Sequence, residues 1–84
     1  MNGSWLFRLW KEKTMGAEEH VYRITEVVGS SSEGVDAAIR NGVSKAAETI
    51  RNIGWFEAIE TRGFVADDKV AYVQVTMKIG FRVD

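Results

Sequence analysis

Residues 70–83 read VAYVQVTMKIGFRV, and apolar side chains alternate with mostly polar ones along this stretch. The odd-numbered positions are all apolar: Ala71, Val73, Val75, Met77, Ile79, Phe81 and Val83. Most even-numbered positions are polar or charged: Tyr72, Gln74, Thr76, Lys78 and Arg82. Because successive side chains of a β-strand point to opposite faces, this period of two predicts a strand with one buried face and one polar face.

Two more strands are predicted upstream. Residues 55–65, WFEAIETRGFV, precede the alternating stretch, and ADDK at 66–69 makes a tight turn that joins the two into a hairpin. Residues 20–28, HVYRITEVV, are rich in β-branched side chains and are followed by Gly29, which is typical of a strand that ends there.

The segment between the first two strands, residues 30–54, predicts an amphipathic helix. Its apolar or small side chains recur three and four positions apart, as on one face of a helix. Ser30 followed by Glu33 matches a capping box, with Ser32 as the alternative cap, and Gly54 suits the left-handed residue that ends a helix. The stripe consists of Val35, Ala38, Ile39, Gly42, Val43, Ala46, Ile50 and Ile53.

The element order is therefore β-α-β-β. It predicts an α+β fold in which a three-stranded antiparallel sheet packs on one amphipathic helix. Centring the hairpin turn at 67–68 places Trp55 opposite Gly80, and Glu57 opposite Lys78, so that opposite charges face each other. One helix covers one face of a sheet, so the other face stays open.

The expected register decides which side chains lie on the open face. Trp55, Ile59 and Gln74 fall on the side away from the helix, whereas Arg62 falls on the helix side and Phe64 in the core under the helix. An exposed and partly apolar sheet face normally marks an interface, so self-association is expected. Opposite Gly80, Trp55 lies six strand positions from Gln74, about 20 Å at roughly 3.3 Å per residue. Any one flat ligand that touches both must therefore lie between two subunits.

Composition excludes several classes of protein. The chain has 84 residues, which predicts one domain, and it has no cysteine and one histidine, His20, so disulfide staples and Cys- or His-rich metal clusters are excluded. Its net charge of −1, with both signs mixed, argues against nucleic acid as a partner. No apolar run is long enough for a membrane span, and the expected location is the cytoplasm.

Residues 1–19, MNGSWLFRLWKEKTMGAEE, differ from the rest because they carry two of the three tryptophans and then turn charged. We interpret them as an N-terminal extension, either flexible or derived from upstream or cloning sequence. A segment that docks on a partner or a neighbouring subunit is the alternative, and membrane contact is the least favoured. The folded domain is expected to span residues 20–84.

Candidate catalytic groups are few. The sequence has no glycine-rich phosphate loop, no nucleophile elbow and no metal-ligand spacing, which argues against an enzyme. The serines at 30–32 could bind phosphate at a helix start, but capping is the simpler role. His20 stands alone at a strand start. Arg62 has two interpretations: an ion pair with Glu60, or a donor to an anionic or carbonyl-rich ligand near a subunit boundary.

Three stretches together resemble the dodecins: HVYRITEVVGSSSEGVDAAI, GWFEAIETRG and VAYVQVTMKIGFRVD. The likeness covers residues 20–84. It implies a small flavin-binding protein, not an enzyme, that assembles into a hollow dodecamer and holds flavins in pairs, stacked between tryptophans of neighbouring subunits. It implies storage, buffering and photoprotection of free flavin. Flavin mononucleotide (FMN) is the expected ligand, with riboflavin or FAD as alternatives, and some members also bind coenzyme A.

The resemblance also implies site residues. Trp55 matches the tryptophan that stacks on the isoalloxazine, and Gln74 matches the glutamine that bonds its polar edge. Arg62 matches an arginine near the flavin, and Arg82 a basic position near the phosphate or coenzyme A. Weaker candidates for that last position are Arg23 and Lys45. The competing hypotheses are a small flavin-dependent redox protein and an oligomeric interaction module that binds no flavin.

Overall fold

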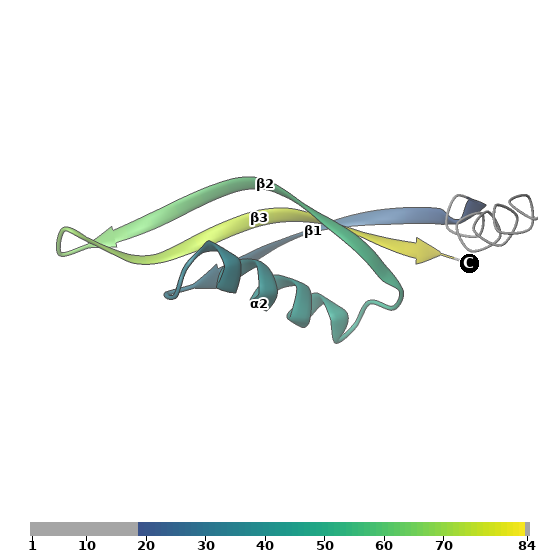
Figure 1. The fold of residues 1–84 in the computed structure, drawn as a ribbon, viewed down its shortest axis with the longest axis horizontal. Coiled ribbons are helices and arrows are strands. Elements are labelled where there is room, and N and C mark those ends of the chain that lie inside the picture. The colour runs from purple at the N-terminus through teal and green to yellow at the C-terminus, as the bar shows by residue number, and fades with distance from the viewer. Residues whose placement is uncertain (1–18, 84) are drawn as a thin grey trace, which may run out of the picture.

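The computed structural model describes residues 19–83 (Figure 1). The predicted extension at 1–19 therefore lies outside the described residues, apart from Glu19. The elements are β1 (Val21–Ser31), α2 (Val35–Ala47), β2 (Ile53–Ala66) and β3 (Lys69–Val83). The order β-α-β-β confirms the predicted fold. No helix within 19–83 has the length and apolar character needed to cross a membrane.

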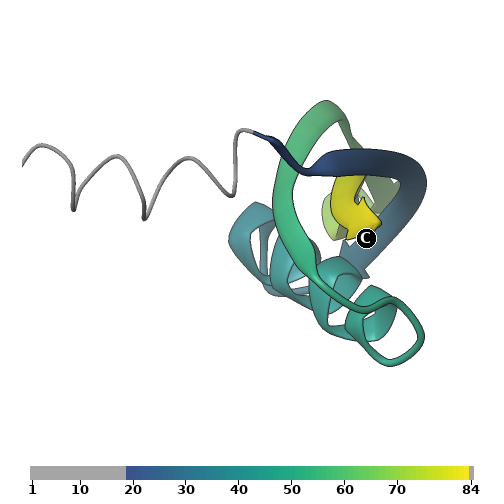
Figure 2. The ribbon, with the colours of Figure 1, turned by 90° about the vertical axis from the view of Figure 1, so that its right-hand side faces the viewer.

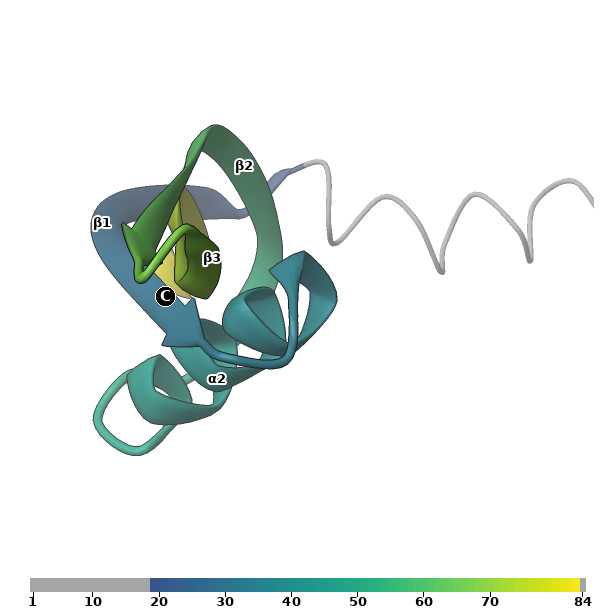
Figure 3. The same ribbon diagram turned by 90° about the vertical axis from the view of Figure 1, so that its left-hand side faces the viewer.

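The alternating strand β3 is the centre of the sheet. The strand order is β1-β3-β2, and both pairings are antiparallel. Val75, Met77 and Ile79 are fully buried, as the period of two predicts, and they pack with Ala38 of the helix. Figures 2 and 3 look along the long axis and show α2 lying to one side of the three strands. The opposite face of β3 bears its even-numbered residues, and no helix within residues 19–83 covers it.

Two glycines allow the helix to lie close to β1. A Cβ atom on Gly29 would stand 1.9 Å from the carbonyl oxygen of Ala38, a distance that no real contact tolerates. A Cβ atom on Gly42 would stand 2.8 Å from Cε of Met77 and 3.4 Å from the α-carbon of Gly29. Both glycines are buried. Close packing of β1, α2 and β3 therefore depends on missing side chains at these two positions.

The helix does not begin as predicted. Its N-cap is Gly34, at φ 135°, and no side chain caps it. The hydroxyl of Ser31, not that of Ser30 or Ser32, accepts a hydrogen bond from the backbone N–H of Glu33 at 2.9 Å. Ser31 therefore stabilises the turn before the helix, and the predicted capping box is wrong.

The end of the helix also differs from the prediction. The last helical residue is Ala47, and the left-handed residue of the connection is Asn52, at φ 62°. Gly54 already belongs to β2. Asparagine tolerates the left-handed conformation because its short polar side chain bonds locally, and it takes the role assigned to the glycine.

A β-bulge at Ile59 changes the register of the hairpin. Trp55 lies opposite Gly80, and the predicted pairing holds as far as Ala58. Ile59 is then the extra residue on β2, and Arg62 comes to lie opposite Gln74. A bulge puts two residues against one, so the side chains from Glu60 to Phe64 move to the other face. A second register shift between Phe64 and Val65 then restores the predicted pairing, with Val65 opposite Val70. The prediction that Arg62 lies on the helix side is therefore wrong.

The sheet is much longer than the helix that covers it. The 13 residues of α2 span about 20 Å, whereas the 15 residues of β3 span about 50 Å. The β2–β3 hairpin consequently extends past the helix (Figure 1). Every residue of β2 after Ile53 is exposed in the single chain. Four fully buried residues form the centre of the core, which is small for a chain of this length.

Candidate functional site

The sheet face opposite α2, here called the open face, is built from cross-strand rows on β1, β3 and β2. Because β3 alternates, its even-numbered residues point to this face and fix the rows. Each row joins one residue of β3 to its partner in β1, in β2 or in both. From one end to the other, the rows centre on Arg82, Gly80, Lys78, Thr76, Gln74 and Tyr72.

Trp55 lies flat against the strand at one end of the open face. A Cβ atom on Gly80 would stand 2.1 Å from Cε2, 2.3 Å from Cζ2 and 2.6 Å from Cδ2 of the indole. The ring therefore covers the space that any other residue at position 80 would fill. Trp55 is 39% exposed, so one side of the indole rests on the backbone while part of the ring remains available.

Arg62 and Gln74 form a row toward the other end of the open face. They lie opposite each other, with Ser30 of β1 on the far side of Gln74. The guanidinium Nη2 of Arg62 donates to Oε1 of Glu60 at 2.7 Å, and these side chains are 51% and 57% exposed. The ion pair weighed from the sequence is thus present, but it lies in solvent, where such pairs contribute about 1 kcal/mol or less. The pair leaves the other guanidinium hydrogens for a ligand.

The next row toward the turn is aromatic. Phe64 and Tyr72 stack with ring centroids 4.6 Å apart and planes inclined by 11°. They are 37% and 38% exposed. The pattern placed Phe64 in the core under the helix, and the bulge at Ile59 reverses that prediction.

Charged residues separate the two ends of the open face. Lys78 lies between Glu26 of β1 and Glu57 of β2, which confirms the predicted Glu57–Lys78 pairing. The next row pairs Thr76 with Glu60. The aromatic surfaces at Trp55 and at Phe64 are consequently divided by a polar band.

Gln74 and the Gly80 partner of Trp55 are six residues apart on β3, a separation of about 20 Å. The observed register keeps this value, because the bulge lies on β2. Arg82, opposite Tyr22, occupies the row beside Trp55, and its backbone N–H donates to the carbonyl of Asn52 at 3.0 Å. The open face thus collects Trp55 and Arg82 at one end and Arg62 and Gln74 at the other.

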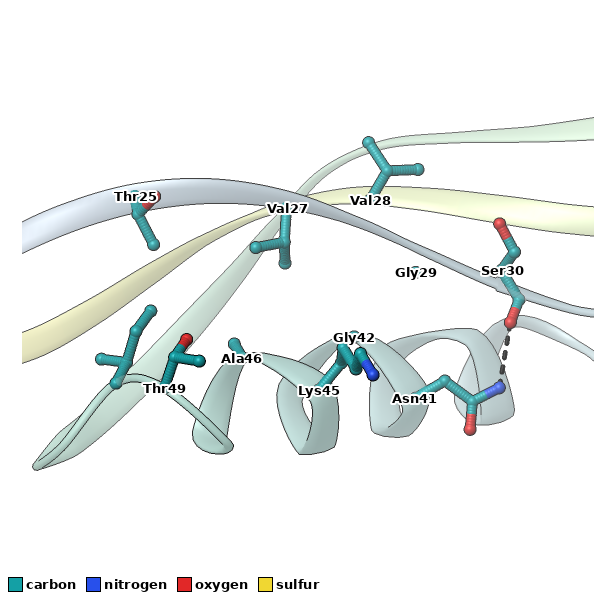
Figure 4. A pocket seen from close by; sticks show the side chains of 11 residues that line it. Thr25, Val27, Val28, Gly29, Ser30, Asn41, Gly42, Lys45, Ala46 and Thr49 are labelled. Atoms are coloured by element: carbon teal, nitrogen blue, oxygen red, sulfur yellow. Dashed lines mark hydrogen bonds between the residues drawn. The ribbon is translucent and has the colours of Figure 1, made fainter.

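The two weaker candidates lie elsewhere. Arg23 is on the helix side of β1, opposite Phe81. Lys45 is on α2, 82% exposed, and forms an ion pair with Glu48 at 3.3 Å. It lines a cavity of about 550 Å³ between β1 and the helix (Figure 4).

That cavity has an apolar floor and a polar rim. Figure 4 shows Val27 pointing toward the helix and Val28 pointing away from it. On the rim, Nδ2 of Asn41 donates to the carbonyl of Ser30 at 2.9 Å. Within residues 19–83 no cluster of three or more His, Asp or Glu side chains is arranged to hold a metal ion.

The dodecin family model matches residues 21–84 of this chain. The chain belongs to the dodecin family. Dodecins are small flavin-binding proteins and not enzymes, as the sequence predicted. The matched segment includes every row of the open face and the whole helix.

Individual dodecins are similar to this chain over nearly their full length. Dodecin from Thermus thermophilus is 41% identical over 64 residues, which cover 76% of this chain and 93% of that protein. The structure of dodecin from Streptomyces davaonensis is 55% identical, covers 79% of this chain and 97% of its own, and superimposes with a TM-score of 0.76. The Streptomyces coelicolor structure is 50% identical, with coverages of 79% and 94% and a TM-score of 0.75.

Three solved variants of Thermus thermophilus dodecin carry substitutions at aromatic or basic positions. In one a tryptophan is replaced by phenylalanine, and in each of the others an arginine is replaced by alanine. Those arginines follow that tryptophan by seven and 27 positions.

Two features of this dodecin site were not found from the sequence. The sequence predicted that Gly80 pairs with Trp55, but not that it supports the indole. A strand register gives the pairing of residues and not the orientation of a side-chain ring. The Phe64–Tyr72 stack was missed because the bulge at Ile59 was missed. The sequence offered one signal for it, since an aromatic residue stands near the turn on each strand, Phe64 on β2 and Tyr72 on β3.

Proposed function

We propose that this dodecin stores and sequesters free flavin, FMN or riboflavin, as stacked pairs held between Trp55 side chains of neighbouring subunits in a dodecamer. The observation that carries the proposal is the indole of Trp55, laid flat on Gly80 at the edge of an open sheet face. A fixed, partly exposed indole is a platform for a flat aromatic ring.

The other residues supply polar contacts. Gln74 offers an amide that both donates and accepts, which suits the alternating groups on the pyrimidine edge of an isoalloxazine. Arg62, opposite it, adds a fixed cation for the carbonyl oxygens. Arg82, beside Trp55, is placed to hold the phosphate of FMN or of coenzyme A. Arg62 and Arg82 follow Trp55 by seven and 27 positions, the same spacings as the substituted arginines of Thermus thermophilus dodecin.

The proposed site requires more than one subunit. Trp55 and Gln74 of one chain are about 20 Å apart along the sheet, too far for one isoalloxazine to touch both. A flavin that contacts both side chains therefore takes them from different chains. The small core and the uncovered β2 support the same conclusion, because oligomerisation supplies the burial that one chain lacks.

Sequestration follows from the stacked arrangement. A flavin between an indole and a second flavin has neither face open to a hydride donor, which disfavours the redox alternative. An indole in contact is also an electron donor to photoexcited flavin, so Trp55 both binds the flavin and quenches its excited state. Arg23 and Lys45, on the helix side of the chain, stay weaker candidates for the phosphate or coenzyme A.

Fluorescence titration tests the proposal. Flavin emission should fall as assembled protein is added, and Trp55→Ala should abolish the quenching while the assembly keeps its mass. A colourless assembly that leaves flavin emission unchanged would favour the interaction module instead. Turnover of a nicotinamide substrate by the flavin-loaded protein would favour the redox protein.

A further inference from the structure

The stacked pair Phe64–Tyr72 is a feature of the open face that the proposed function does not use. The rings lie one row from Arg62 and Gln74, on the same face and the same two strands. Neighbouring rows on one face of a sheet are about 7 Å apart, so an aromatic side chain in one row can reach a ligand bound at the next. The pair is outside the core cluster, and α2 does not extend over this part of the hairpin (Figure 1).

We infer that Phe64 and Tyr72 form an aromatic wall that contacts the bound flavin beside the edge held by Gln74. The inference rests on the proposed function, because it requires a flavin at Gln74. If one flavin touches Trp55 of one chain and Gln74 of another, the side chains next to Gln74 lie at the same composite site. Phe64 and Tyr72 are the side chains of the next row toward the turn.

The geometry of the pair suits this role. Each ring fixes the other, at 4.6 Å and 11°, so little side-chain freedom is lost when a ligand is bound. Rings that are 37% and 38% exposed still present apolar surface. The neighbouring rows in the other direction carry Glu60, Glu57 and Lys78, which offer no such surface. The hairpin end of the site therefore has one apolar boundary, and this pair makes it.

The wall strengthens the polar contacts by keeping water away from them. Hydrogen bonds from Gln74 and Arg62 to a flavin compete with water as long as the row is open. An adjacent apolar wall lowers the local dielectric, and in such surroundings these bonds are stronger. Phe64 and Tyr72 thus add to the affinity for flavin, whereas quenching depends on Trp55.

Replacing both rings separates this role from a structural one. Phe64→Leu combined with Tyr72→Leu keeps apolar volume for any subunit contact but removes the flat rings. We expect FMN and riboflavin to bind about tenfold more weakly, since each aromatic contact contributes up to about tenfold. The quenching of flavin that is bound at saturation should stay as strong as in the unaltered protein. Val65→Leu, at the Val65–Val70 pair beyond the register shift, is the matched control and should leave affinity unchanged.

The readouts distinguish the possible failures. If the unaltered protein binds no flavin, the proposed function fails and this inference fails with it. If the unaltered protein binds flavin, and the double leucine variant keeps its mass and its affinity, only the inference is overturned. If the double leucine variant no longer assembles, the rings are a subunit contact and the inference is also overturned.

Discussion

The indole of Trp55 lies over the α-carbon of Gly80, where a Cβ atom would stand 2.1 Å from Cε2 of the ring. The two residues face each other across β2 and β3 on the side of the sheet that the helix leaves open. The relationship means that the orientation of the tryptophan is set by the absence of a side chain on the neighbouring strand. In the proposed site, Gly80 therefore controls the platform on which a flavin would stack.

Gly80→Ala tests this control. The new methyl group must push the indole off the strand, so we expect flavin affinity to fall about tenfold or more, with weaker quenching, as the stacked contact is lost. Fluorescence titration measures both. Gly63→Ala is the matched control on the same hairpin, because its Cβ atom would lie 3.8 Å from the nearest atom, Cγ1 of Val73, an ordinary contact. Equal affinity of the two variants would contradict the assigned role of Gly80.

The contact between β1 and the helix makes a separate prediction about stability. Gly29→Ala places a methyl group 1.9 Å from the carbonyl oxygen of Ala38, and backbone cannot rotate away as a side chain can. We expect the free energy of unfolding to fall by about 1–3 kcal/mol, the usual cost of overpacking. Urea unfolding at a fixed subunit concentration measures it, since oligomers unfold in a concentration-dependent way. A variant as stable as Gly63→Ala would show that the helix moves freely on the sheet.

Much of the fold followed from sequence because periodicity acts through the backbone. The alternation of β3 placed Val75, Met77 and Ile79 inside, and a two-residue turn at 67–68 placed Trp55 opposite Gly80. The bulge at Ile59 could not be predicted in the same way, since an inserted residue has no characteristic side chain. The bulge decides which face of the sheet Arg62 lies on, so missing it put Arg62 on the wrong face.

The candidate site was predicted in part for related reasons. Trp55 lies before the bulge at Ile59, and Gln74 lies on the part of β3 that alternates without a register shift, so their faces followed from simple counting. The helix start was missed because Ser30, Ser31 and Ser32 are chemically alike, and only the path of the chain selects Ser31 as the acceptor.

The hairpin turn offers a stabilising change. Asp67 and Asp68 both have positive φ, 54° and 64°, a conformation that glycine adopts without steric cost. Asp68→Gly should therefore raise the free energy of unfolding by about 0.5–1 kcal/mol. Thermal unfolding measures the change, with Asp68→Ala as the control that should be no more stable than the unaltered protein. A lower melting temperature for the glycine variant would mean that the aspartate makes a contact of its own in the assembly.

Substitutions in the Arg62–Glu60 ion pair test whether Arg62 serves as a structural ion pair or as a hydrogen-bond donor to flavin. Arg62→Met should change the free energy of unfolding by about 1 kcal/mol or less, because both partners are more than half exposed. It should weaken flavin binding by about tenfold, since a hydrogen bond from a charged donor is lost. Glu60→Gln breaks the same ion pair but keeps the arginine, so it should retain affinity. A large loss of stability with unchanged affinity would make the ion pair structural.

Mixing two defective proteins tests whether one flavin takes Trp55 and Gln74 from different chains. Trp55→Ala and Gln74→Ala should each bind flavin poorly when assembled alone. In assemblies refolded from an equal mixture, about one quarter of the composite sites should pair an intact tryptophan with an intact glutamine, because chains of a symmetric oligomer combine at random. Stoichiometric titration would then recover tight binding at that fraction of sites. If both side chains came from one chain, every site in the mixture would stay defective. The approximately 20 Å between Gln74 and Gly80 on β3 predicts recovery.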